Sequence, residues 1–329
     1  MNLAHVDQIA KAVLYEGYML YPYRPSSVKN RQRWNFGVLC PPAYSDAQGG
    51  TEACRMQTEC LVQGNARVLL EVKVRFLQLQ LRCTSARDAM ESRPSGSWQE
   101  AVERDISVTV FPLETVVFGP VTQTFELPAE TSAEPDSSTG GEIVRGRAAI
   151  RGEIEITVQG IRPALLRVRV EVRNTTPFDV HEAVRDDAVL HSLVSAHTIL
   201  GVRGGEFVSL LEPPEELKEV AAQCRNVGVW PVLVGEPGQR DTMLASPIIL
   251  YDYPQIAPES AGDLFDGTEI DEILSLRIMT LTDEEKREIR QSDTRANEIL
   301  ERTETLPAEQ FMKLHGVLRS LRPLKETTP

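Results

Sequence analysis

The sequence predicts an α+β protein, in which a mainly antiparallel β-sandwich or barrel-like domain is joined to a smaller α/β unit and a helical C-terminal arm. Three observations lead to this fold class. Apolar side chains fall at every second position over long stretches of the first half, helical and strand patterns alternate after Asn174, and acidic residues with helix caps dominate the last part. We therefore expect three parts, residues 1–177, 178–256 and 257–329.

The organising feature of the first part is a pair of alternating runs, residues 148–158 and 163–173. Their alternation predicts strands with one face on a core and one face in water. One simple antiparallel register, centred on Ile161, sets complementary charges opposite each other: Glu155 with Arg167, Glu153 with Arg169, and Arg151 with Glu171. Such pairs contribute about 0.2–1 kcal/mol each, so we predict a hairpin in this register.

An amphipathic helix is expected near the N-terminus, over about residues 3–19. Its apolar residues follow the i, i+3, i+4, i+7 spacing, and they are Val6, Ile9, Ala10, Val13 and Leu14. We expect this helix to cap a sheet.

Residues 54–82 predict a hairpin that turns at Gly64-Asn65, because this pair readily supplies the positive φ of a tight turn. The second strand changes the parity of its apolar residues between Phe76 and Leu77. One extra residue would produce this change, so we expect a β-bulge there.

Two further strands are expected at about 105–112 and 114–126. The stretch 130–142 is polar and rich in Pro, Gly and Ser, which is typical of a flexible loop. Together with the helix and the hairpins, these elements complete the β domain expected over residues 1–177.

In the second part, residues 181–200 and 214–224 predict helices, with short strands between and after them. The histidines His181, His191 and His197 raise a metal hypothesis. On a helix, however, His191 and His197 would lie ~120° apart, so they do not form an i, i+4 ligand pair. We predict no metal site here.

Charge and composition limit the classes of partner. The chain has 329 residues and a formal net charge of −13 at pH 7. Nucleic acid and anionic membranes require a dominant basic surface, so neither is expected as the main partner. The start MNLAHVDQIAKAV does not have the pattern of a signal peptide, and no run reaches the ~20 apolar residues of a membrane helix. We expect a cytoplasmic protein whose partner is a protein or a small molecule, with the protein partner preferred; a homo-oligomer remains open.

Five cysteines, an odd number, argue against a disulfide framework. Cys54 and Cys60 would lie ~20 Å apart along an extended strand, too far to bind one ion, and no Cys-x-x-Cys occurs. We predict neither a metal nor a cofactor. Whether Cys40, Cys54, Cys60 and the histidines converge in the fold is left open.

The last part is acidic, with 14 acidic residues against 6 basic ones between Ala257 and Thr305. Five of them fall within ten residues and are named the acidic segment: Asp263, Asp266, Glu269, Asp271 and Glu272. We predict that the acidic segment binds a basic surface of a protein partner. A solvated surface without a partner is the alternative.

Two stretches carry a family resemblance, SPIILYDYPQIAPESAGDLFDGTEIDEILSLRIMTLTDEEKREIRQSD and SAHTILGVRGGEFVSLLEPP. They resemble the uncharacterised proteins encoded in uptake [NiFe]-hydrogenase gene clusters of the actinobacterial type. The resemblance covers about residues 180–295, and more loosely the first thirty. It implies an accessory or assembly role for a hydrogenase and assigns no binding residues. The chain lacks the paired Cys-x-x-Cys motifs that hold nickel and iron in the large subunit.

Two classes of function therefore stay open. The first is a non-catalytic accessory or assembly factor that binds a protein partner, such as a [NiFe]-hydrogenase subunit. The second is an enzyme of unknown reaction, with a site between the β domain and the α/β unit built from residues such as His191, His197, Asp186 or Cys224. The first is favoured, because the sequence shows no catalytic constellation.

Overall fold

The structure is a computed structural model of the chain, which divides into two compact units, residues 1–18 with 34–255 and residues 19–33 with 256–329. The structure describes residues 6, 9–10, 13–14, 34–65, 67–83, 98–117, 119–135, 141–255, 281–283, 286–287, 290, 300–301 and 303–305. No helix among these residues is long and apolar enough to cross a membrane.

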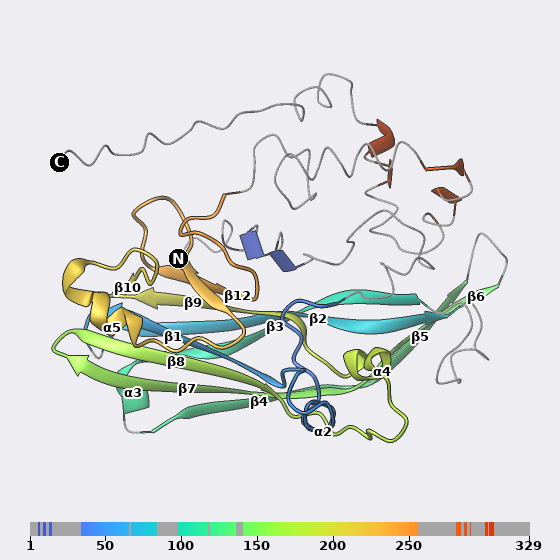
Figure 1. The fold of residues 1–329 in the computed structure, drawn as a ribbon, viewed down its shortest axis with the longest axis horizontal. Helices are drawn as coiled ribbons and strands as arrows, with labels where there is room; N and C mark the ends of the chain where they lie inside the picture. The colour runs from blue at the N-terminus through green and yellow to red at the C-terminus, as the bar shows by residue number, and fades with distance from the viewer. Residues whose placement is uncertain are drawn as a thin grey trace. The chain divides into compact units, whose positions relative to one another are not determined.

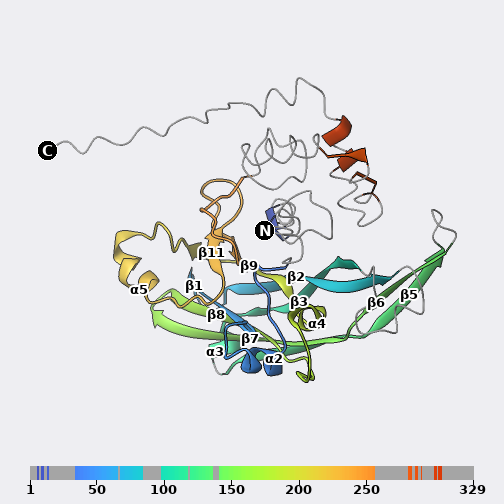
Figure 2. The ribbon, with the colours of Figure 1, turned by 45° about the vertical axis from the view of Figure 1, so that its right-hand side comes forward.

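The first unit contains two antiparallel sheets (Figures 1 and 2). The five-stranded sheet has the order β10-β1-β8-β7-β4. Its strands are β1 (Arg55–Gln63), β4 (Val121–Leu127), β7 (Ile150–Arg162), β8 (Leu165–Asn174) and β10 (Glu206–Val208). All of its strand pairs are antiparallel.

The seven-stranded sheet is built around β2 (Leu69–Cys83), which pairs with β3 along one side and with β9 and β6 along the other. Strands β12 and β11 continue the sheet beyond β9, and β5 continues it beyond β6. The bounds are β3 (Trp98–Pro112), β5 (Glu130–Pro135), β6 (Glu142–Arg147), β9 (Val194–Arg203), β11 (Trp230–Leu233) and β12 (Thr242–Ser246).

The helices of this unit are short. They are α2 (Pro42–Ala47), α3 (Glu114–Val117), α4 (Arg185–Leu190), the 3-10 turn η3 (Glu215–Leu217) and α5 (Lys218–Ala222). Leu217 of η3 and Ala221 of α5 pack on Leu61 and Leu165, so this helical turn covers one end of the five-stranded sheet.

One hydrophobic core lies between the two sheets. It takes Ile154 and Val168 from the five-stranded sheet and Val72 and Val74 from the seven-stranded sheet, all fully buried. The predicted mainly antiparallel β-sandwich is therefore confirmed. Alternation produces it, because each strand directs every second side chain into this shared layer.

Strands β7 and β8 form the predicted hairpin, but the predicted register is wrong. Glu153 faces Arg173 rather than Arg169, and Glu155 faces Glu171. The turn lies two residues later than expected because Pro163, whose φ is fixed near −65°, suits a turn position, and Ala164 follows it with a φ of 59°.

Strands β1 and β2 do not form the hairpin expected at Gly64-Asn65. They belong to different sheets, so the segment between them crosses from one layer of the sandwich to the other. Both strands direct apolar side chains into the same core, which gives the same alternation as a hairpin.

The predicted bulge is present, but its extra residue lies on the neighbouring strand. The register of β2 against β9 shifts between Arg75 and Leu77, while the register against β3 is regular there. The extra residue is on β9, where Ser195 has a φ of 51°. The apolar parity changes because β2 is buried on both faces around Phe76.

Two local predictions were wrong. Residues 130–135 are strand β5 rather than part of a flexible loop, and they pair with β6 through the ion pairs Glu134–Arg145 at 2.6 Å and Glu130–Arg147. The helix expected over 181–200 ends at Leu190, and Val194 begins β9. β9 is buried on both faces, so its apolar run has no alternation that would separate it from a helix.

The strands expected in an α/β unit over 178–256 instead belong to the two sheets, and residues 34–255 form one unit with them. The N-terminal helix agrees with expectation at its described residues. Val6, Ile9 and Ala10 are helical and buried against Ile199 and Leu244, so they cover β9 and β12.

The second unit is described at few residues, and those from 283 to 305 that are described are helical. The Lys286 backbone N–H donates to the Thr282 carbonyl at 2.9 Å, as expected where a helix starts at Thr282. Glu304 forms ion pairs with Lys286 at 3.0 Å and Arg290 at 2.7 Å.

Candidate interaction surface

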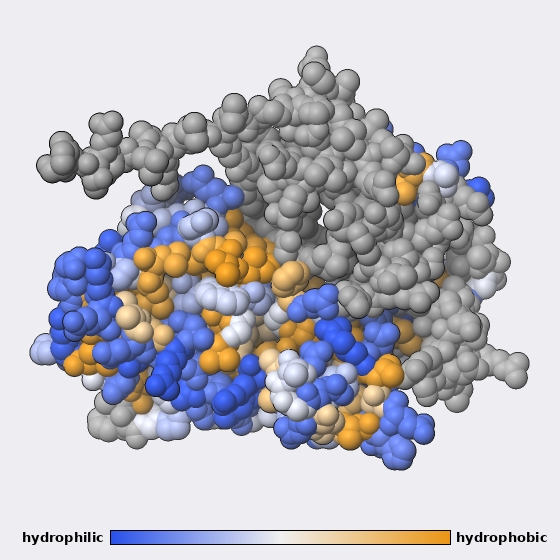
Figure 3. Space-filling model, in the orientation of Figure 1, coloured by the Kyte–Doolittle hydropathy of each residue, from blue (hydrophilic) through white to orange (hydrophobic). Residues whose placement is uncertain are grey.

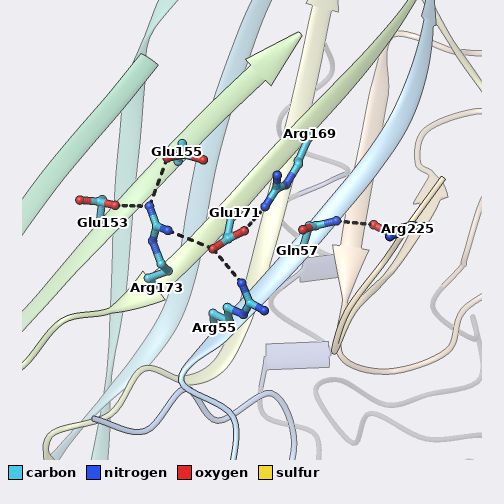
Figure 4. Close-up of polar contacts among 8 residues, drawn as sticks. All are labelled: Arg55, Gln57, Glu153, Glu155, Arg169, Glu171, Arg173 and Arg225. Carbon is cyan, nitrogen blue, oxygen red and sulfur yellow. Dashed lines mark hydrogen bonds and ion pairs between the residues drawn. The ribbon is translucent and has the colours of Figure 1, made fainter. Parts of the chain in front are cut away.

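A network of arginines and glutamates covers part of the outer face of the five-stranded sheet (Figure 4). It is named the charged lattice and consists of Arg55 from β1, Glu153 and Glu155 from β7, and Arg169, Glu171 and Arg173 from β8. These residues alternate with core residues along each strand, so the pleat places them all on one face.

Glu171 is the centre of the charged lattice. Its carboxylate forms ion pairs with Arg55 at 3.6 Å, with Arg173 at 3.3 Å and with Arg169. Only 1% of its side chain is exposed. A carboxylate this buried is tolerated because three guanidinium groups surround it.

Arg173 resolves a conflict between like charges. The observed register places Glu155 directly opposite Glu171, and Arg173 pairs with both of them and with Glu153. Burial lowers the pKa of Arg173, but the hydrogen bond and charge of Glu153 and the charges of Glu171 and Glu155 outweigh it and raise the pKa. The guanidinium therefore acts as a fixed positive charge between two strands.

The arginines of the charged lattice are more exposed than its glutamates. The arginine side chains are exposed by 36% to 63%, whereas the glutamates are exposed by 26% or less. Within the described part of the chain, Arg167 Nε, Arg169 Nε and Glu171 Oε1 are buried without a hydrogen-bond partner. The face that a partner would meet is therefore rich in arginine, in a chain that is acidic overall.

A second feature is a set of large apolar side chains exposed at the edge of the sandwich. It is named the apolar edge patch and consists of Leu211, Val227, Trp230, Ile249 and Tyr251. Tyr251 is 87% exposed and Ile249 is 72% exposed. Hydrophobic residues also gather over the loops that flank β11 and β12 in the space-filling view (Figure 3).

The loop that presents Ile249 and Tyr251 is fixed by Asp252. The Asp252 carboxylate accepts a hydrogen bond from the Leu233 N–H at 2.7 Å and another from the Ser209 hydroxyl. The next residue, Tyr253, donates its N–H to the Leu233 carbonyl at 2.7 Å. The apolar side chains therefore project from a loop bonded to β11 rather than from a loose end.

The apolar edge patch and the charged lattice are neighbours. Val227 exchanges two backbone hydrogen bonds with Gln57, at 2.9 and 3.0 Å, and Gln57 lies directly opposite Glu171 in the β1–β8 pair. The Gln57 side chain also donates to the Arg225 carbonyl at 3.0 Å (Figure 4). An apolar region bordered by polar and charged groups is the usual anatomy of a protein interface.

The sequence predicted sites at the acidic segment and at His191, His197, Asp186 and Cys224. The acidic segment falls outside the described residues. None of the hydrogen bonds of the described chain joins any two of His191, His197, Asp186 and Cys224. His191 packs against Phe178, with ring centroids 5.2 Å apart, so it lies in a packed contact.

His197 is fully buried. Its Nδ1 donates to the Ser195 carbonyl at 2.6 Å, which leaves Nε2 to accept from the Ser246 hydroxyl at 3.3 Å. Burial, together with the charge of Arg75, lowers the pKa of His197 from 6.5 to about 4 despite the Ser195 bond. This histidine is therefore neutral near pH 7 and links the bulge of β9 to the end of β12.

The buried thiols of Cys40 and Cys60 are not activated. Burial raises the pKa of Cys40 to about 11, and it raises that of Cys60 further. Across the described residues, no group of three or more His, Cys, Asp or Glu side chains lies close enough to hold a metal ion. None of the five cysteines, all of which lie among the described residues, forms a disulfide.

Comparison with protein-family models finds no match, and neither does comparison with curated protein sequences. The protein is described by its own fold and surface, as a two-sheet antiparallel β-sandwich with an apolar edge patch beside a charged lattice. Sequence reasoning singled out Arg169 and Glu171 but missed the patch. The run IILYDY could have indicated the patch, because it begins with four consecutive apolar residues, and a strand with one buried face would alternate apolar and polar residues.

Proposed function

We propose that the protein is a non-catalytic accessory or assembly factor that binds a protein partner through the apolar edge patch. The exposure of Ile249 and Tyr251 on a fixed loop carries this proposal. Large apolar and aromatic side chains with little conformational freedom contribute most of the binding free energy at protein interfaces. The more of such a side chain is exposed to water in the free protein, the more apolar surface a partner can bury.

The charged lattice supports the same proposal as the border of the contact. Its most exposed side chains are arginines, and arginine is enriched at interfaces because it can both stack and form paired hydrogen bonds with carboxylates. The acidic segment would add a contact of opposite sign on a helical arm over residues 257–329.

We propose a [NiFe]-hydrogenase subunit as the first partner to test, which rests on the resemblance of residues 180–295. A cytoplasmic location goes with this proposal. The lack of disulfides among the five cysteines is typical of a reducing compartment.

The test compares tagged full-length chains purified from the native host, with mass spectrometry of the co-eluting proteins. Covering two such side chains contributes about 1.5–3 kcal/mol each, so Ile249→Ser with Tyr251→Ser should weaken the complex by at least about 100-fold. Val180→Ser, at another exposed apolar residue outside the patch, is the matched control and should retain the partner.

The outcomes separate the parts of the proposal. Loss of a hydrogenase subunit only in the double variant supports the whole of it. Loss of a different protein in that variant keeps the patch as a binding surface and rejects the hydrogenase. Equal recovery of every protein with wild type and double variant rejects the patch.

A further inference from the structure

Strand edges offer a separate line of inference. Among the described strands, β4 and β10 form the edges of one sheet, and β3, β5 and β11 have a neighbour on one side only in the other. Unpaired N–H and C=O groups at an edge are a template for another chain, so folded proteins protect them with short strands, charges, prolines, bulges or covering loops.

Two edges are covered by the chain itself. β10 is only three residues long, and its Phe207 N–H donates to the Arg240 carbonyl at 2.7 Å. At β11, Leu233 bonds to Asp252 and Tyr253, as described above. Neither edge presents a continuous row of backbone groups.

Two more edges carry the other protective devices. β5 contains Glu130, Glu134 and Pro135, so charges and a proline interrupt it. The pairing of β3 with β2 is irregular between Leu70 and Val72, and the Ser107 carbonyl of β3 already accepts a hydrogen bond from the Gln123 side chain at 3.2 Å.

The remaining edge, β4, carries fewer of these devices. Its one charged residue, Glu126, pairs with Arg151 of β7 at 3.1 Å, and its Gln123 side chain is the group that reaches the Ser107 carbonyl of β3. Its seven residues hold an unbroken register with β7 and include no proline and no lysine. Phe125 packs directly on Gly152 of β7, where a Cβ would lie 2.2 Å from the ring, and its ring lies 6.1 Å from that of Phe76 in the core. The strand is therefore held firmly, with its outer side unpaired by any described strand.

The sequence of β4 is also complementary to itself. In an antiparallel pair of two copies centred on Thr124, Val121 faces Leu127 and Gln123 faces Phe125 on the inner side. On the outer side, Thr122 faces Glu126. Val121 and Leu127 form an apolar pair, Thr124 meets its own copy, and no two like charges meet.

We infer that two copies of this chain associate through β4, in an antiparallel pair centred on Thr124 that joins their five-stranded sheets. The arrangement is isologous, so each contact occurs twice about a two-fold axis. It uses β4 rather than the apolar edge patch and does not depend on the proposed partner binding.

Charge variants at Thr122 and Glu126 test this register in the full-length chain. Both side chains are exposed. Thr122→Glu places glutamate opposite Glu126 of the second copy, twice. We expect the dimer dissociation constant, measured by sedimentation velocity over a concentration series, to rise by about 2- to 30-fold.

Glu126→Lys alone faces an uncharged threonine of the second copy and should change the dimer dissociation constant little. Within its own chain it replaces the Glu126–Arg151 ion pair by two like charges, a cost to folding that the double variant shares. Combined with Thr122→Glu, it restores two opposite-charge pairs and should recover dimerisation. Within one chain these two positions are ~13 Å apart and do not touch, so recovery must come from the second copy. Glu155 lies opposite Thr122 in the same chain, so any destabilisation within the chain persists in the double variant and does not mimic recovery.

Two results would overturn the inference. One is a wild-type chain that stays monomeric at every concentration up to about 100 μM, which would mean that the dissociation constant of any such dimer is well above that concentration. The other is a dimer whose dissociation constant is the same in wild type, Thr122→Glu and the double variant, because association then uses another surface.

Discussion

The buried His197 predicts how the stability of the sandwich depends on pH. Its pKa falls from 6.5 to about 4 on folding, so between these values the unfolded chain binds a proton that the folded chain does not. Stability is therefore fully present above pH 6.5 and is lost as pH falls toward 4. The single group accounts for about 3 kcal/mol between pH 7 and pH 4, of which about 2 kcal/mol is lost by pH 5.

The assay is urea unfolding at half-unit steps of pH, followed by tryptophan fluorescence. All three tryptophans, Trp34, Trp98 and Trp230, belong to the first unit, so the signal reports the sandwich. His197→Gln should lower the free energy of unfolding at pH 7 by about 1–2 kcal/mol, since its hydrogen bonds are weakened. It should also reduce the loss of stability between pH 7 and pH 5 by about 2 kcal/mol. His191, whose pKa is also lowered by burial, contributes to the loss that remains.

His181→Gln is the matched control, because His181 is exposed and only its backbone N–H, which the change retains, bonds Asp179. It should follow the wild-type pH dependence. If His197→Gln and wild type lose stability equally between pH 7 and pH 5, then His197 is not held neutral by burial and the reasoning fails.

Three further predictions concern the charged lattice, the acidic segment and metal content. Glu171→Gln leaves three guanidiniums without their shared carboxylate and should lower the free energy of unfolding by about 1–3 kcal/mol. Arg55→Gln, at an exposed arginine 3.6 Å from Glu171, should lower it by at most about 1 kcal/mol. Equal losses in urea unfolding would show that Glu171 is not the centre of the charged lattice. Replacing the acidic segment by Asn and Gln should slow association with the partner at low salt and leave the melting temperature unchanged; unchanged association at low and high salt would remove its docking role. Elemental analysis should find no stoichiometric metal, and about one zinc or iron per chain would contradict this.

Alternation along single strands was enough to predict the class of fold, and it was not enough to predict strand partners. Side chains of β1 and β2 alternate as a hairpin would, yet the strands face each other across the core. Likewise, the register of β7 and β8 was predicted from the charges of these two strands alone, without the neighbouring strand β1. The turn at Pro163-Ala164 and the contact of Arg55 of β1 with Glu171 favour the observed register. In that register Arg173 pairs with both Glu155 and Glu171, which offsets their repulsion.

The proposed interaction surface was harder to predict, because it is assembled from distant segments. Ser209, Leu233 and Asp252 meet only in the folded chain, and their hydrogen bonds decide that Tyr251 is fixed and exposed. No local pattern of apolar residues in the sequence predicts these three hydrogen-bonded neighbours. The N-terminal helix shows the opposite case, because its spacing alone defined the face that is buried.

Hydrogen-exchange mass spectrometry of the purified chain, alone and with the co-purified partner, would show whether the partner covers the apolar edge patch. If it does, exchange should slow on binding in peptides that cover residues 209–212, 225–230 and 247–253, with no change in β5 and β6. Protection confined to β5 and β6, or no protection at the patch in a formed complex, would contradict the proposed role of the patch.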